Sequence, residues 1–146
     1  IASQAALHGF TVKVFGSGWW RAKFKLNKSK NLIVKNGWIS RDEMIDHYRR
    51  SKLAVALYSS VNRNKTSGRI FELAALGTPF LVKPNDIVNE SLLHYLSFDQ
   101  IYNNQFWAQL INDYSTVQRK FISQTSECEK YSWSSRILEC IKVIQR

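Results

Sequence analysis

The chain of 146 residues lacks any apolar run long enough to cross a bilayer, and no signal-peptide pattern opens it. It has only two cysteines, Cys128 and Cys140, so a disulfide framework is excluded. Neither cysteine forms a metal-binding spacing with the three histidines of the chain. These absences favour a cytoplasmic protein with reduced thiols and no structural metal site.

The glycine-rich loops of two large nucleotide-binding classes are also missing. Gly16 and Gly18 begin a Gly-x-Gly pattern, but Arg21 stands where a dinucleotide-binding fingerprint needs its third glycine. The Gly-x-x-x-x-Gly-Lys-Ser/Thr pattern of P-loop nucleotidases does not occur. Gly16 and Gly18 are more simply interpreted as residues that let the backbone turn tightly beside a ligand.

What the chain does contain is enough apolar sequence for one globular domain, and an excess of positive charge. Hydrophobic residues make up 45% of the chain, and the formal net charge is +10. Part of this charge lies in one short stretch, at Arg21, Lys23, Lys25, Lys28, Lys30 and Lys35. The stretch is typical either of a patch for nucleic acid or another anionic acceptor, or of a solvated loop and sheet edge. We favour the second interpretation because no nucleic-acid-binding motif accompanies it.

Predicted strands and helices alternate along the chain. Strands are expected at 11–15, 31–34, 53–58, 79–82 and 94–98, and helices at 1–9, 41–51, 67–77, 104–130 and from 132 onward. A short helix within 85–92 is also expected. Ser40 and Glu43 are expected to form a capping box for the 41–51 helix, with Met44, Ile45 and Tyr48 facing inward. The predicted core of the 104–130 helix is Phe106, Leu110, Ile111, Tyr114 and Phe121. This alternation predicts an α/β protein in which helices cover both faces of a parallel sheet.

The most informative segment is the helix at 67–77 between two apolar strands. Ile70, Leu73, Ala74 and Gly77 recur at helical spacing, so one stripe of this helix is expected to pack on the sheet. Its start is rich in free backbone amides and suits a phosphate, and Glu72 lies about one turn further in. Gly77 suits the left-handed residue that ends a helix, and Pro79 cannot prolong it. Glu72 could accept hydrogen bonds from both ribose hydroxyls of a ligand whose diphosphate lies at the helix start. The alternative is a solvated glutamate on an amphipathic helix.

Five segments in order resemble the nucleotide-binding half of GT-B glycosyltransferases, and more narrowly the group-1 enzymes related to the spore-maturation protein CgeB. The segments are Val12–Trp19, Asn36–Ile39, Tyr48–Leu57, Arg69–Pro79 and Tyr131–Arg136. Together they span nearly the whole chain. The resemblance implies a Rossmann-like domain over residues 1–146 that binds a UDP- or GDP-activated sugar as substrate, without a cofactor or a metal.

The same resemblance implies the residues of a donor site. Glu72 would bind the ribose, and Ser67, Gly68 and Arg69 would lie at the diphosphate. The base would be lined by Trp38 and Ile39, and the cleft would be bordered by Gly16 and Gly18. Arg69 would stabilise the leaving diphosphate, its alternative role being a salt bridge at the helix start.

Two features of the chain depart from the family pattern and change the activity that we expect of it. Asn64 stands where retaining members often place a second glutamate, so the stereochemical outcome is open. The chain opens at Ile1 directly as a predicted helix, which leads us to expect a fragment. It would lack the central first strand of its domain and the N-terminal acceptor domain, and would not catalyse transfer by itself. We assign no catalytic residue, and keep as alternatives a non-catalytic nucleotide-binding or scaffold relative and a basic nucleic-acid-binding module.

Overall fold

The computed structural model describes residues 1–18, 30–57, 68–83, 94–132 and 134–135. Several predictions fall on the other residues and lie outside the described part. They concern Ser67, Asn64, Cys140, the expected short helix within 85–92, most of the basic stretch and most of the last helix.

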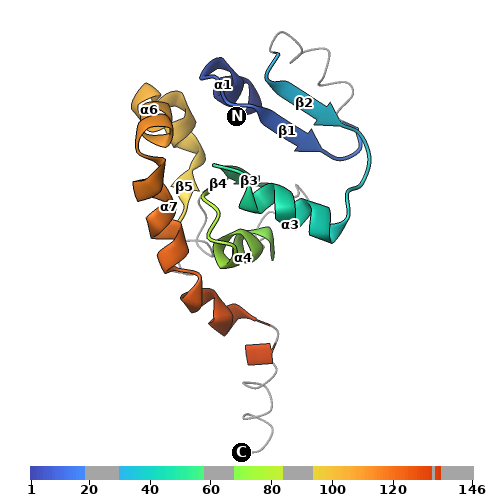
Figure 1. Cartoon of the computed structure of the whole chain (residues 1–146), viewed down its shortest axis with the longest axis vertical. Coiled ribbons are helices and arrows are strands. Elements are labelled where there is room, and N and C mark those ends of the chain that lie inside the picture. Colours follow the sequence, from blue (N-terminus) through green and yellow to red (C-terminus); the bar gives the residue numbers. More distant parts are fainter. Residues whose placement is uncertain (19–29, 58–67, 84–93, 133, 136–146) are drawn as a thin grey trace, which may run out of the picture.

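The described residues hold five strands where the sequence predicts strands, interspersed with helices (Figure 1). The first half holds α1 (Ala2–Leu7), β1 (Val12–Phe15), β2 (Leu32–Lys35), α3 (Arg41–Arg49) and β3 (Ala54–Ala56). The second half holds α4 (Gly68–Ala75), β4 (Phe80–Val82), β5 (Leu96–Ser97), η2 (Phe98–Tyr102), α6 (Asn104–Asn112), α7 (Tyr114–Ser123) and η3 (Ser126–Tyr131). In the part of the chain that is described, no helix has the length and apolar character to cross a membrane.

All strand pairs are parallel, which confirms the α/β class with a Rossmann-like arrangement. The strands nevertheless form two sheets, one of β1 and β2 and one in the order β3-β4-β5. In the first sheet Val12 is in register with Leu32, and in the second Ala54 is in register with Phe80. The single sheet expected from the sequence is therefore divided, within the described residues, between β1 and β3.

The buried core surrounds the second sheet. All three residues of β4 are fully buried, as are Ile70, Leu73 and Ala74 of α4. The periodicity of the sequence predicted this buried stripe of α4, and the structure confirms it. β1 and β2 contain no fully buried residue, so the two sheets differ sharply in how well they are covered.

The expected helix at 104–130 is interrupted. Asp113 ends α6 and precedes α7, with φ −134° and ψ 43°, and the last turns form η3. Phe106, Leu110 and Phe121 are buried as predicted, but Ile111 is 50% exposed. Trp107, which the prediction omitted, is almost fully buried and donates from Nε1 to the Ile101 carbonyl at 2.8 Å.

Gly77 ends α4 as expected. Its φ is +64°, and its N–H donates to Ala74 O while Thr78 N–H donates to Leu73 O. These two bonds form a Schellman motif, which satisfies carbonyls that the helix end would leave free. A Cβ at Gly77 would stand 3.2 Å from Ile122 Cγ1, so glycine also permits the close approach of α7.

Candidate functional site

The amphipathic character of α4 determines where Arg69 and Glu72 lie. Because Ile70, Leu73 and Ala74 face the core, Arg69 and Glu72 lie on the outer part of the helix. Their side chains are 35% and 43% exposed, and Arg69 Nε lies 3.7 Å from Glu72 Oε2. The two residues that the sequence assigned to phosphate and ribose are thus neighbours, and the alternative role of Arg69 as a salt-bridge partner is also observed.

Arg69 joins α4 to α3. Its Nη1 donates to the Tyr48 hydroxyl at 2.7 Å and also contacts Met44 Sδ. The guanidinium carbon lies 5.6 Å from the centre of the Tyr48 ring, within the range of a cation–π contact. Tyr48 therefore orients the Arg69 guanidinium through both its hydroxyl and its ring.

The prediction placed Met44 and Tyr48 among the inward-facing residues of the 41–51 helix, without assigning them a partner. The structure packs Tyr48 against the core and brings both side chains to Arg69. Tyr48 O also accepts a hydrogen bond from Thr78 Oγ1 at 3.2 Å, which ties the end of α3 to the segment after α4. The spacing of four between Met44 and Tyr48 signals a shared helix face. Sequence spacing alone gave no indication that this face meets Arg69.

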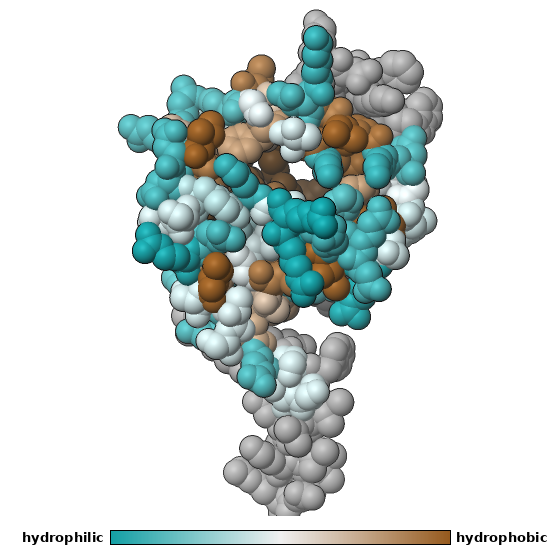
Figure 2. All heavy atoms as spheres, in the orientation of Figure 1, coloured by the Kyte–Doolittle hydropathy of each residue, from teal (hydrophilic) through white to brown (hydrophobic). Residues whose placement is uncertain are grey.

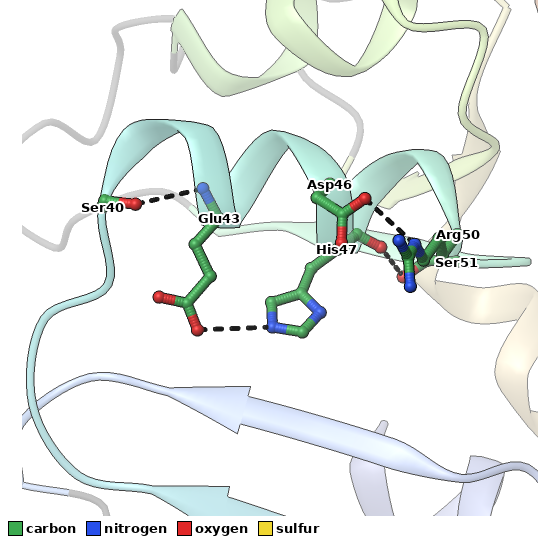
Figure 3. Close-up of polar contacts among 6 residues, drawn as sticks. All are labelled: Ser40, Glu43, Asp46, His47, Arg50 and Ser51. Atoms are coloured by element: carbon green, nitrogen blue, oxygen red, sulfur yellow. Dashed lines mark hydrogen bonds and ion pairs between the residues drawn. The ribbon is translucent and has the colours of Figure 1, made fainter.

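Glu43 and His47 extend from α3 toward β1 (Figure 3). Ser40 Oγ accepts from Glu43 N–H at 3.1 Å, which confirms the predicted N-cap. The Glu43 carboxylate does not complete a capping box; it lies 3.8 Å from His47 Nε2 instead. The His47 ring lies 4.7 Å from the ring of Phe15, so α3 contacts the end of β1 through this side chain.

The remaining predicted site residues that the structure describes lie after β1, after β2 and at the start of α4. Gly16 and Gly18 come directly after β1 with φ of +128° and +83°, values at which glycine is favoured. Trp38 and Ile39 lie between β2 and α3; Trp38 is 96% exposed and Ile39 is half-buried. Gly68 is the first residue of α4 and is exposed. The predicted residues therefore form two groups, one after β1 and β2 and one on α4.

The α4 group can bind a ligand that carries both negative charge and hydroxyls. Arg69 offers a planar, permanently charged donor, and Glu72 offers a carboxylate that accepts from hydroxyl groups. Over the described ranges, no three His, Cys, Asp or Glu residues are grouped so that they could hold a metal ion. Cys128, the cysteine that these ranges include, is buried and not in a disulfide.

These features define an α/β domain with a polar pair on the helix between two parallel strands. Residues 1–101 match the protein family described as Glycosyl transferase-like. The match covers more than half of the 146 residues, so the chain belongs to this glycosyltransferase family. It includes all five strands together with α3 and α4. Searches of curated proteins and of solved structures each gave no match.

Proposed function

We propose that the chain is the donor-binding part of a glycosyltransferase that moves a sugar from a UDP- or GDP-sugar to an acceptor. Family membership supports the reaction class. The observation that carries the proposal is the pairing of Arg69 with Glu72 on the exposed face of α4. A cation and a carboxylate adjacent on one helix face match the diphosphate and the ribose of such a donor.

A donor can replace the Arg69–Glu72 ion pair at little cost. Partly exposed pairs three residues apart on a helix contribute only about 0.3–0.5 kcal/mol, and 3.7 Å is a long separation for such a pair. Charge-assisted hydrogen bonds from ribose hydroxyls to Glu72 would contribute about 1.5–3 kcal/mol. In the proposed complex Glu72 therefore turns to the ribose, and Arg69 neutralises the leaving diphosphate.

The finer assignment is to the C-terminal half of a GT-B enzyme of the CgeB-like group. In that arrangement Gly16, Gly18, Trp38 and Ile39 complete the donor cleft, and Ser67 and Gly68 supply amides to the diphosphate. A partner domain supplies the acceptor site and the base, so we assign no catalytic residue to this chain. The proposed reaction uses the nucleotide-sugar as substrate and needs no metal.

Calorimetric titration of the chain with UDP-glucose, UDP-N-acetylglucosamine and GDP-mannose tests the proposal. Glu72→Ala should weaken the affinity for whichever donor binds by about tenfold to a hundredfold, because it removes the ribose acceptor. Glu127→Ala is the matched control, since Glu127 is an exposed glutamate on η3. Equal affinity in Glu72→Ala and the parent chain would contradict the assignment of the ribose site.

The alternative to a glycosyltransferase is a basic nucleic-acid-binding module, which the net charge of +10 would suit. Lys13 of β1, Lys30 just before β2 and Lys35 of β2 are exposed. Such a module would bind an oligonucleotide at low salt and lose affinity steeply as salt rises. Binding of this kind, with no donor binding, would favour the alternative over the transferase.

A further inference from the structure

The thioether of Met44 lies against the cation that we place at the diphosphate. Arg69 Nη1 contacts Met44 Sδ and also donates to the Tyr48 hydroxyl at 2.7 Å. A thioether sulfur is only a weak acceptor, so the Tyr48 hydroxyl is the stronger of these two partners in the reduced protein. The sulfur therefore occupies a position at which a better acceptor would strengthen the hold of α3 on Arg69.

Met44 can be reached by an oxidant from solvent. It is half-buried, and it belongs to α3, which contains no fully buried residue. Figure 2 shows mainly hydrophilic residues at the surface where Figure 1 places α3 and α4. Cys128, the other sulfur-containing residue of the described ranges, is buried. Among the described residues, Met44 is therefore the sulfur that a small peroxide reaches most readily.

We propose that Met44 is an oxidation site whose sulfoxide retains Arg69 on α3 and weakens anion binding at the start of α4. In the oxidation step the sulfur lone pair attacks one oxygen of hydrogen peroxide. The S–O bond forms as the O–O bond breaks, and the hydrogen of the transferred oxygen passes to the departing hydroxide, which leaves as water. The sulfur is oxidised by two electrons and the peroxide is reduced by two.

The sulfoxide changes the contact because it replaces a weak acceptor by a polar S–O group. Its oxygen can accept a hydrogen bond from the Arg69 guanidinium, and a hydrogen bond from a charged donor is roughly twice as strong as a neutral one. A phosphate oxygen accepts from the same N–H groups. The sulfoxide and a bound anion therefore compete for Arg69, so oxidation lowers the affinity for the anion.

This inference rests on the anion-binding part of the proposed function, and not on the nucleotide or the sugar. Inorganic pyrophosphate is accordingly the probe, because it requires only the anion site. Met44 is the single methionine of the chain, so the response of this residue can be separated from oxidation of other side chains by one substitution.

The first experiment tests the new contact without any ligand. Urea denaturation compares the reduced and peroxide-treated forms of the parent chain and of Arg69→Ala. Oxidation places a polar group at a half-buried position and should lower stability in both proteins. The loss in the folding equilibrium constant should be about threefold to tenfold smaller in the parent, because only there can the sulfoxide accept from Arg69. Equal losses in the two proteins would overturn the proposal.

The second experiment is an NMR titration with pyrophosphate before and after peroxide treatment. The fully oxidised parent should bind pyrophosphate about threefold to tenfold more weakly than the reduced parent, and methionine sulfoxide reductase should restore the affinity. Met44→Leu is the matched control, because leucine is of similar size and forms no sulfoxide. Its affinity, whatever the starting value, should be the same before and after treatment.

Met44→Gln provides a permanent amide acceptor and should bind pyrophosphate as weakly as the oxidised parent. Unchanged affinity on full oxidation of the parent, or an equal loss in Met44→Leu, would overturn the proposal. A reduced parent that does not bind pyrophosphate would overturn it as well. Pyrophosphate binding that responds to peroxide as expected, with no binding of any nucleotide-sugar, would refute the donor assignment and support the Met44 site.

Discussion

Replacing Tyr48 by phenylalanine tests whether this residue orients Arg69. The substitution removes the hydroxyl that accepts from Arg69 at 2.7 Å and keeps the ring beneath the guanidinium. It also keeps the backbone carbonyl that accepts from Thr78. A hydrogen bond to a charged group contributes about 1.5–3 kcal/mol, and water can replace part of it because Arg69 is 35% exposed. We therefore expect Tyr48→Phe to lower the free energy of unfolding by about 1 kcal/mol.

A double-mutant cycle isolates the interaction. Urea denaturation of the parent chain, Tyr48→Phe, Arg69→Gln and the double variant should give a coupling energy of about 0.5–1.5 kcal/mol. Tyr102→Phe is the matched control, because Tyr102 is 77% exposed and its loss of a hydroxyl should change stability little. A coupling energy below about 0.3 kcal/mol would show that Tyr48 does not hold Arg69 in solution.

Two further predictions concern stability. Gly77→Ala should destabilise the chain by about 1–2 kcal/mol or more in urea denaturation, because φ is +64° and the new Cβ would meet Ile122. Gly9→Ala is the control, because Gly9 has φ +84° and nothing lies within 4 Å of the new Cβ, so its loss of stability should reflect backbone strain alone. An equal loss of stability in the two variants would contradict the close packing at Gly77. Burial raises the pKa of Tyr114 above its usual 10.0, so the unfolded chain releases this proton first and the free energy of unfolding should fall as pH rises above about 10. Tyr114→Phe should remove that part of the decline, as measured by urea midpoints across about pH 9–11, and an unchanged slope would refute it.

The sequence predicted those features that depend on neighbouring residues. The stripe of Ile70, Leu73 and Ala74 follows from helical period, and the end of α4 follows from the position of Gly77. The cap at Ser40 follows from residue type and the helix pattern after it. Each of these is decided within a few residues, where local physical chemistry is sufficient.

Features that depend on distant segments could not be predicted from the sequence. Arg69 and Tyr48 are 21 residues apart, and nothing in helical spacing specifies that their helices meet. Apolar runs predicted each strand but not which strands pair, so the division between β1 and β3 does not follow from these runs. Trp107 was missed because the core of α6 was assigned to one narrow stripe, whereas Trp107 packs beside Phe106, their ring centres 5.0 Å apart.

The division of the sheet bears directly on the proposed donor site. Arg69 and Glu72 belong to a helix whose inner face is fully buried, so their positions are held by the core. Gly16, Trp38 and Ile39 follow strands with no fully buried residue, and α3 connects the two parts. If base and ribose are bound by these separate groups, their relative placement depends on α3 and on its contact with Arg69 of α4 through Tyr48.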